Sequence, residues 1–442
     1  MTNIALSAGW IDRLSQFTKL IVGFSGGLDS TVLLHILSSH PLLHHRLTAV
    51  HIHHGISPNA DYWQRHCEQF CRDLTIPFLS RAVHFDRSAN LEEGARVARY
   101  AVFSSLLSAD DCLFLGHHMD DQAETVLLQL FRGAGIDGLA AMTEWGVLGL
   151  GSMARPLLSY TRIQLEDYAK NHELQWIDDE SNQEIKYSRN YLRHEIMPLL
   201  TKKWPGVVGN IARTAVHCQQ AKVNLDALAH YDSQENTLNH YSLCLAPLKE
   251  LSLDRIANVL RTWLKNNQVQ MPSTLTFQRL IDEVLFASSD ANPEVSWDNI
   301  IVRRYQQFLY INQKESTNLT ANTGPSVKRF HKPITWLHFP LPLILQELNI
   351  CLIAKQAEQG LVIPQQAKIT VQFRQGGEQI RLHGQTKQLK KLFQEWSVPP
   401  WERDTIPLIY INDQLAAVVG YAVSDLFYSK DAPQAWVLLT NS

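Results

Sequence analysis

The chain has 442 residues, of which 45% are apolar and 19% charged, and its formal net charge is −3 at pH 7. This composition excludes disordered and fibrous proteins, and the length is that of about three domains. Because surfaces that follow phosphates are positive, the slightly acidic balance confines any nucleic-acid contact to a local basic patch.

The amino-terminal half alternates short β-rich apolar runs with amphipathic stretches. Its first residues, MTNIALSAGWIDRLSQF, lack the unbroken apolar core of a signal peptide, and no run in the chain is long enough for a membrane span. We therefore expect a cytoplasmic protein. Strands are predicted over 20–24, 47–52 and 112–115, and helices over 31–38, 62–74 and 120–132. This rhythm predicts an N-terminal doubly wound parallel sheet, which we place in a domain of residues 1–215.

The second half is expected to contain two smaller domains. Helical spacing over 248–286, followed by a strand-like run over 300–311, predicts a mainly helical middle domain at 216–312. The polar run QKESTNLTANTGP opens a predicted linker region at 313–361. Residues 362–442 are expected to form a C-terminal α+β domain, with a helix at 389–396 and strands at 369–373, 407–411 and 415–419.

The strongest local signal is a glycine-containing loop between the first predicted strand and the helix after it. Its residues are Ser25, Gly26, Gly27, Leu28, Asp29 and Ser30. The glycine pair allows a close backbone approach, and the helix amino terminus presents unpaired N–H groups, so the loop is suited to phosphate. Asp29 beside a polyanion is explained if it holds a Mg²⁺ ion on the phosphates. The alternative is an ordinary glycine turn with a helix cap.

A second polar constellation follows the predicted strand 112–115. It contains His117, His118, Asp120, Asp121 and Glu124 at the start of the next helix. Three- and four-residue spacing brings the carboxylates to one side of the first turn, where they suit a cation or an amine. The alternative is that acidic residues simply favour a helix amino terminus.

Six cysteines show no paired spacing, so we expect reduced, buried thiols. His51 and His53 share a strand face, but no third ligand is evident and we predict no metal site there.

The loop Ser25–Ser30 matches the PP-loop of the ATP pyrophosphatase family, whose members cleave ATP between the α- and β-phosphates. Within that family the chain resembles the lysidine synthases. The resemblance rests on residues 93–100, 116–125, 155–158, 178–182 and 189–194, and it resumes at 389–393 and 398–404. It implies an adenine nucleotide alpha hydrolase-like fold in the first domain. His53 and Ser57 depart from the residues common in relatives, so no role is expected for them.

The resemblance also implies an activity. Such an enzyme ligates L-lysine to C2 of the wobble cytidine in the CAU anticodon of isoleucine tRNA, giving lysidine. ATP first adenylates the C2 oxygen, and the lysine ε-amine then displaces AMP, with pyrophosphate as the other product. The tRNA changes from methionine to isoleucine specificity. The implied cofactors are ATP and Mg²⁺, and no membrane or protein partner is implied.

Carried over to this chain, the resemblance assigns residues to roles. Ser25, Gly26, Gly27, Leu28, Asp29 and Ser30 are expected to bind ATP, with Asp29 on the metal. Asp121 and Glu124 are expected to hold the lysine amine, while Arg99, Arg189 and Arg193 serve the substrate phosphates or carboxylate. The expected catalytic residues are Asp29, His117, Asp121 and Glu124. The base that takes the amine proton is open among the two acids, with His117 as a possible helper.

Basic and aromatic residues alternate near the carboxyl end, where Lys387, Lys390, Lys391 and Arg403 stand among Phe393, Trp396 and Trp401. Charges that neutralise phosphate and rings that stack on bases suit an RNA surface, so we predict tRNA binding by Lys387, Lys390, Lys391, Arg403 and Trp401. The middle domain is also expected to bind tRNA. The alternative is a solvated helix face over an aromatic core.

Three other functions are weighed against the ligase. A tRNA thiolation enzyme would share the activation step but would need reactive or cluster-binding cysteines. A nucleotide-binding module that docks tRNA without catalysis would not need the acids. A small-molecule amidotransferase is disfavoured because no glutaminase unit is evident.

Overall fold

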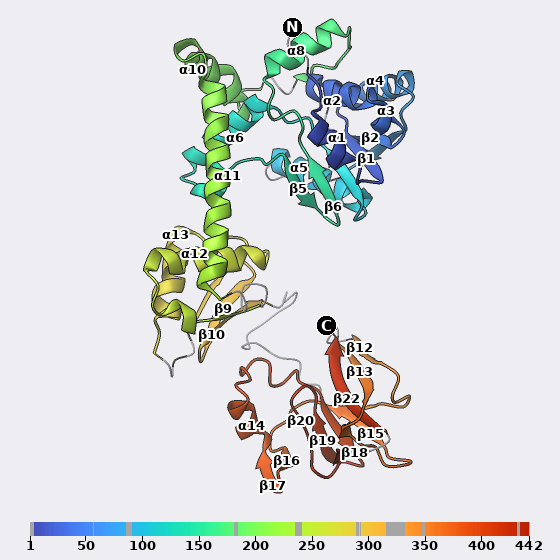
Figure 1. Ribbon diagram of the computed structural model, residues 1–442, viewed down its shortest axis with the longest axis vertical. Coiled ribbons are helices and arrows are strands. Elements are labelled where there is room, and N and C mark those ends of the chain that lie inside the picture. The colour runs from blue at the N-terminus through green and yellow to red at the C-terminus, as the bar shows by residue number, and fades with distance from the viewer. Residues whose placement is uncertain are drawn as a thin grey trace. The chain divides into compact units, whose positions relative to one another are not determined.

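The computed structural model describes residues 4–55, 57–84, 91–180, 184–234, 241–288, 291, 293–314, 332–346, 350–430 and 434–441. The chain divides into two compact units, Met1–Leu228 and Ala229–Ser442 (Figure 1). Among the described helices, none combines the length and apolar character that crossing a bilayer requires.

The first unit is built on a six-stranded sheet with the order β3-β2-β1-β4-β6-β5. Its strands are β1 (Lys19–Gly23), β2 (Leu47–His53), β3 (Phe78–Ala82), β4 (Asp111–Phe114), β5 (Trp145–Leu148) and β6 (Gly151–Ala154). All neighbours are parallel except the edge strand β5, which runs antiparallel to β6. The predicted parallel sheet is therefore confirmed, with one antiparallel edge.

Both faces of this sheet are buried, as expected for a parallel sheet wound with helices. Along β1, Leu20 and Val22 belong to one apolar cluster while Ile21 belongs to another. Because successive strand residues point to opposite faces, the two clusters lie on the two sides of the sheet. The helices are α1 (Ala8–Leu14), α2 (Leu28–Ser38), α3 (Pro41–His44), α4 (Ala60–Asp73), α5 (Leu91–Leu106), α6 (Met119–Phe131), α7 (Ile136–Leu139), α8 (Arg162–Asn171), α9 (Ser188–Tyr191), a π-helical turn (Leu192–Ile196), α10 (Met197–Lys203) and α11 (Val207–Asp232).

The second unit begins with helices packed on a small antiparallel sheet. The sheet has the order β7-β10-β9-β8, and Trp263 is fully buried in its core. The elements are β7 (Ser242–Cys244), a 3-10 turn (Ala246–Leu248), α12 (Leu253–Asn266), α13 (Thr274–Arg279), a π-helical turn (Leu280–Leu285), β8 (Glu294–Trp297), β9 (Ile300–Tyr305) and β10 (Phe308–Gln313). The predicted helices are confirmed, and the run 300–311 is a hairpin rather than one strand.

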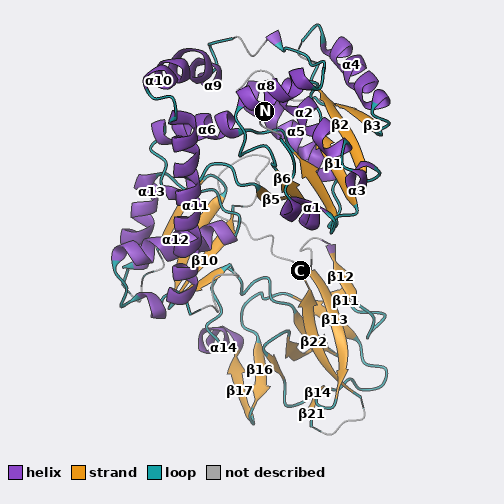
Figure 2. Ribbon diagram, turned by 45° about the horizontal axis from the view of Figure 1, so that its top comes forward, coloured by secondary structure: helices purple, strands orange, loops and turns teal. Residues whose placement is uncertain are grey.

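The rest of the second unit is mainly β (Figure 2). Two five-stranded sheets have the orders β11-β15-β18-β19-β20 and β12-β13-β22-β14-β21, and β16 pairs with β17. The elements are β11 (Ile334–Thr335), β12 (Leu343–Leu345), β13 (Ile350–Ala357), β14 (Gly360–Leu361), β15 (Ile369–Gln372), β16 (Gln379–Leu382), β17 (Gln385–Gln388), α14 (Leu389–Glu395), β18 (Leu408–Ile411), β19 (Gln414–Val418), β20 (Ala422–Val423), β21 (Tyr428–Ser429) and β22 (Ala435–Asn441).

The expectation of a linker over 313–361 was wrong for its second half. Strands β11, β12, β13 and β14 all lie in that region, and β13 pairs with β22 from Cys351–Asn441 to Ala357–Ala435. The partner strand lies at the far end of the chain, so no local pattern marks the pairing. Most of the polar run, residues 315–331, lies outside the described residues.

Candidate active site

The glycine-containing loop joins β1 to α2 and is held by its own serines. Ser25 N–H donates to Ser30 Oγ at 3.3 Å, and the two hydroxyl oxygens lie 3.0 Å apart. Gly27 N–H donates to Ser25 Oγ at 3.3 Å, and Ser30 Oγ–H donates to the Gly27 carbonyl at 3.0 Å. Gly27 is the N-cap of α2 without a side-chain cap. The first N–H groups of the helix are therefore available for an anion.

Two glycines permit close contacts around this loop. Gly26 has φ +84°, and a Cβ there would lie 2.8 Å from both Cys67 Sγ and Ile177 Cδ1. Gly116 follows β4, and a Cβ there would lie 3.0 to 3.1 Å from backbone atoms of Asp29 and Ser30. A Cβ at Gly26 would push packed side-chain atoms aside, and a Cβ at Gly116 would require backbone atoms to shift by a few tenths of an ångström.

Asp29 and His118 join the loop to the second constellation. His118 Nε2 lies 3.7 Å from Asp29 Oδ1 and 3.4 Å from Asp121 Oδ2. Burial raises the pKa of Asp29, although the nearby His118 opposes this shift. For His118, burial lowers the pKa, but the hydrogen bond with Asp120 and the charges of Asp121 and Asp29 outweigh it and the pKa is raised.

The Asp29 carboxylate has an oxygen suited to a cation. Oδ1 is buried and makes no hydrogen bond among the described residues. Mg²⁺ is commonly held by one or two carboxylates together with substrate phosphates, so this donor at the phosphate loop fits the ion.

Asp121 and Glu124 are paired with two arginines from the segment that follows α8. Arg193 Nε and Nη2 donate to Glu124 at 2.7 and 2.9 Å, and Nη2 also donates to Asp121 Oδ1 at 3.0 Å. Arg189 Nε donates to Glu124 Oε2 at 2.8 Å. Burial would raise the pKa of Asp121, but His118 and the arginines lower it to about 2. Asp120 instead lies 3.5 Å from His118 Nδ1 and accepts the backbone N–H of Arg162 at 2.8 Å.

His117 has a separate partner. Arg155 Nε donates to His117 Nδ1 at 3.2 Å, and Arg155 Nη1 donates to the Thr143 carbonyl at 2.8 Å. Burial, together with the charges of Arg155, Arg189 and Arg99, lowers the pKa of His117 to about 3, against an opposite effect of Asp121. The ring is therefore neutral at physiological pH.

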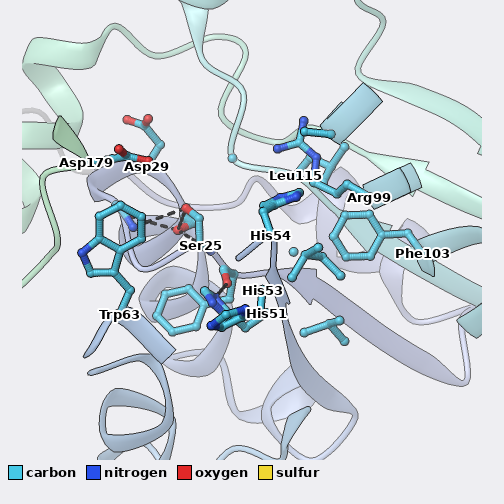
Figure 3. A pocket seen from close by; sticks show the side chains of 18 of the residues that line it. Ser25, Asp29, His51, His53, His54, Trp63, Arg99, Phe103, Leu115 and Asp179 are labelled. Atoms are coloured by element: carbon cyan, nitrogen blue, oxygen red, sulfur yellow. Dashed lines mark hydrogen bonds between the residues drawn. The ribbon is translucent and has the colours of Figure 1, made fainter. Parts of the chain in front are cut away.

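A cavity of about 500 Å³ lies between the phosphate loop and the residues that follow β4. Figure 3 shows Ser25, His51, His53 and His54 around it, with Trp63 on one side and Arg99 and Phe103 on the other. Its lining also includes Gly27, Asp29, Ser30, His117, Asp121 and Asp179. The phosphate loop, His117 and one acid of the second constellation thus face the same space, as does Arg99 from α5.

Several residues of this cavity were missed from the sequence. Trp63 follows the start of α4 and Asp179 follows α8, and both line the cavity. Asp179 belongs to the run 178–182 without a role of its own, and Ser181 and Asn182 lie outside the described residues. Trp63 carried no local signal, because an aromatic residue on an amphipathic helix is normally core.

The structure separates the predicted tRNA-binding residues into exposed lysines and residues that are paired or packed within the protein. Lys390 and Lys391 are exposed on α14, whereas Lys387 is paired with Glu395 at 3.3 Å. Arg403 is only 9% exposed and donates to the Val398 carbonyl and to Tyr305 Oη, both at 2.9 Å. Trp401 packs edge-on against Tyr310, with 5.5 Å between ring centroids. Arg403 and Trp401 therefore make contacts within the second unit.

The three cysteines of the first unit that lie in its core are buried thiols with raised pKa values. Cys67, Cys71 and Cys112 are free and buried, and burial raises the pKa of Cys71 and of Cys112 to about 12. The expectation of buried, reduced thiols is confirmed for these three, while Cys218, Cys244 and Cys351 are half-buried.

A phosphate loop between β1 and α2 of a parallel sheet, with an acidic cluster after β4, defines a PP-loop nucleotide-binding domain. The PP-loop domain family matches residues 5–200. The TilS substrate binding domain matches residues 243–310, and the TilS substrate C-terminal domain matches residues 369–440.

Relatives that match over their full length show to which family of PP-loop proteins the chain belongs. The tRNA(Ile)-lysidine synthase of Legionella pneumophila (strain Lens) is 59% identical over 444 residues, covering 100% of both chains. That of Coxiella burnetii is 40% identical, covering 97% of this chain and 94% of the relative, and that of Serratia proteamaculans is 37% identical, covering 99% of each. The chain belongs to the tRNA(Ile)-lysidine synthase family.

Proposed function

We propose that this chain ligates L-lysine to C2 of the wobble cytidine in the CAU anticodon of isoleucine tRNA, forming lysidine. ATP adenylates the C2 oxygen and releases pyrophosphate, and the lysine ε-amine then replaces AMP. The modified tRNA changes its codon and amino-acid specificity from methionine to isoleucine. The observation that carries the proposal is one cavity lined by the phosphate loop and Asp121, in a chain 59% identical throughout to a tRNA(Ile)-lysidine synthase.

The phosphate loop supports the activation step. Ser25, Gly27 and Ser30 line the cavity, and the amino terminus of α2 offers N–H groups to ATP phosphates. Mg²⁺, when bound, would be held by Asp29 together with the phosphates and would neutralise charge on them. The C2 oxygen is a poor leaving group until it forms the adenylate, so activation must precede the attack of the amine.

The acid and arginine cluster supports the lysine step. Free lysine has an ε-ammonium with an ordinary pKa of about 10.4, so it must be bound and deprotonated before it attacks. Asp121 lies on the cavity wall and faces the amine in this proposal. Glu124 is 2% exposed, and with Arg189 and Arg193 it fixes the orientation of Asp121.

The second unit supports a tRNA substrate. Two of its segments, residues 243–310 and 369–440, match substrate domains of the family. Exposed Lys390 and Lys391 on α14 supply cations for phosphate contacts in a chain of net charge −3.

One experiment tests the whole proposal. Purified protein is incubated with ATP, Mg²⁺, isotopically labelled lysine and isoleucine tRNA, and the digested nucleosides are analysed by mass spectrometry. We expect cytidine carrying the labelled lysine, with AMP and pyrophosphate formed in equal amounts. Cytidine of unchanged mass would reject the proposal, and a sulfur-containing nucleoside would replace it with thiolation.

A further inference from the structure

His117 and Arg155 form a pair whose chemistry the proposed function leaves open. Arg155 directly follows the β6 ladder, in which Ala154 pairs with Phe114, and His117 lies three residues beyond Phe114. Arg155 is 8% exposed, and its bond to the Thr143 carbonyl fixes the guanidinium in place. The His117 ring is therefore held from one side by a buried, immobile cation.

The partner determines which ring nitrogen carries the proton. A guanidinium has only N–H donors and does not lose its proton in proteins. Because Arg155 Nε donates to His117 Nδ1 at 3.2 Å, Nδ1 must present its lone pair. The single proton of the neutral ring is then on Nε2. Neither nitrogen can accept a proton from a substrate unless the bond with Arg155 breaks.

The other ring nitrogen, Nε2, is not engaged by Arg155. His117 lines the cavity together with Ser25 and Asp29. In the part of the chain that the structure describes, Nε2 makes no hydrogen bond of its own. The charged groups that act on the ring are Arg155, Arg189 and Arg99, which oppose protonation, and Asp121, which favours it. The outcome is a neutral donor beside the phosphate loop.

We infer that His117 acts as a neutral hydrogen-bond donor, through Nε2–H, to an oxygen of the adenylate, and that Arg155 is the positioning residue that fixes this tautomer. The inference rests on the proposed function, since the adenylate is its intermediate. When the lysine nitrogen bonds to C2, the C2–O bond breaks and its electron pair remains on the oxygen of AMP. A fixed donor stabilises that growing charge without transferring a proton. The amine proton goes to a carboxylate, which is Asp121 in the proposed function.

Two substitutions at His117 distinguish the role of hydrogen-bond donor from that of general base. Glutamine has an N–H donor and no basic nitrogen, so His117→Gln should keep lysine attachment within about tenfold of the wild type. His117→Ala has no donor and should lose about 10²- to 10³-fold. If His117 were the base, both variants would lose activity equally, and that result would overturn the inference.

Substitutions at Arg155 test its positioning role. Lysine also donates only, so Arg155→Lys should keep the pH profile of lysine attachment, whereas Arg155→Gln, whose amide can donate or accept, should add a titration near neutral pH. Arg72→Gln removes an exposed arginine, paired with Glu68, and is the control for losing one cation. An Arg155→Gln profile identical to that of the wild type would overturn the positioning role.

A spectroscopic measurement tests the tautomer without any catalysis. In the full chain labelled with ¹⁵N-histidine, the His117 signals are assigned by their loss in His117→Gln. We expect an unprotonated Nδ1 and a protonated Nε2 from pH 7 down to pH 5. A proton on Nδ1 at pH 7 would overturn the inference. If the wild type forms no lysidine while Nε2 carries the proton, the proposed function fails and the tautomer stands.

Discussion

Arg193 and Glu124 form a two-point ion pair, with Nε 2.7 Å from Oε1 and Nη2 2.9 Å from Oε2. Glu124 lies on α6, and Arg193 lies in the π-helical turn 192–196. Parallel N–H to oxygen bonds of this kind are among the stronger and more directional contacts in proteins. The pair therefore fastens the segment after α8 to the helix that carries the acids.

Replacing Glu124 should destabilise the first unit. Glu124→Gln keeps the shape but leaves Arg189 and Arg193 without one of their two carboxylates. We expect the free energy of unfolding to fall by about 2 to 3 kcal/mol. This is at or below the low end of the range for breaking a buried ion pair, because the arginine side chains are 31% and 24% exposed. Urea unfolding of the full chain measures the change.

The matched control is the surface pair Arg72–Glu68, at 3.3 Å on one helix. Glu68→Gln should cost about 0.5 kcal/mol or less. Equal losses in the two variants would show that the cluster around Glu124 contributes no more than a surface ion pair.

Gly26 should tolerate no side chain. Gly26→Ala combines a φ of +84° with contacts of 2.8 Å to Cys67 and Ile177, so we expect a loss of roughly 2 to 4 kcal/mol and weakened ATP binding. Gly133 has φ +68° but nothing within 4 Å of a Cβ, so Gly133→Ala should cost only about 1 to 2 kcal/mol. Thermal unfolding with and without ATP compares the two variants. Equal losses of stability would show that the contacts with Cys67 and Ile177 add nothing to the cost of Gly26→Ala.

Asp29 should be required for catalysis and not for folding. Its Oδ1 is buried without a hydrogen bond among the described residues, and burial disfavours its charge. A neutral isostere would remove the charge 3.7 Å from His118 Nε2, but that nitrogen keeps Asp121 Oδ2 at 3.4 Å. We expect Asp29→Asn to form AMP at least about 10²-fold more slowly, because charge on the phosphates is no longer neutralised. The unfolding temperature should be unchanged or higher. AMP formation at the wild-type rate would remove Asp29 from the metal site.

Acid should destabilise the first unit through histidines whose pKa is lowered in the folded chain. Burial lowers the pKa of His117 to about 3 and of His54 to about 4, and it also lowers the pKa of His35 and His51. Below pH 6.5 these histidines bind protons in the unfolded chain but not in the folded chain. Their contribution to the free energy of unfolding is therefore complete above pH 6.5 and falls steadily toward pH 4. His118, whose pKa is raised, has the opposite sign: its contribution to stability is complete below pH 6.5 and is lost as the pH rises through its folded pKa, so it adds nothing to the acid-induced loss.

Urea unfolding midpoints measured between pH 7 and pH 5 test whether stability falls on acidification. His117→Gln should remove part of the slope, roughly 1 to 2 kcal/mol at pH 5, because glutamine does not titrate. A wild-type midpoint that rises on acidification would contradict the assignment of these histidines as neutral.

Local patterns carried most of what could be predicted. The loop Ser25–Ser30 and the helix after it are adjacent in the chain, and strand, turn and helix signals agree there. The same holds for the acids at the start of α6. Such elements are visible in a sequence because neighbours along the chain determine them.

Contacts between distant segments could not be predicted. Arg155 reaches His117 only because β6 pairs with β4 in the register Phe114–Ala154, and one residue of slip would turn Arg155 to the other face. Similarly, the alternation of basic and aromatic residues in the sequence predicts one surface that contains Lys387, Arg403 and Lys390. The fold pairs Lys387 with Glu395 and buries Arg403 against Tyr305.

The exposed lysines of α14 should contribute to tRNA binding. The helix buries Leu389, Leu392 and Phe393, so Lys390 and Lys391 point away from the core. Each phosphate contact releases bound counterions, and losing one lowers the salt dependence of the affinity. We expect Lys390→Glu with Lys391→Glu to weaken tRNA binding most at low salt and to reduce the slope of log affinity against log salt by about 1 to 2.

The control for this charge reversal is a second pair of exposed lysines in the same unit, Lys355 and Lys368. Reversing both changes the net charge equally, so any effect of overall charge will be the same in the two double variants. Filter binding at several salt concentrations measures tRNA affinity, and ATP affinity is measured in parallel. ATP affinity should not change, because the phosphate loop lies in the first unit. Identical tRNA affinities in the two double variants would assign the effect to net charge and would exclude α14 from the RNA-binding surface.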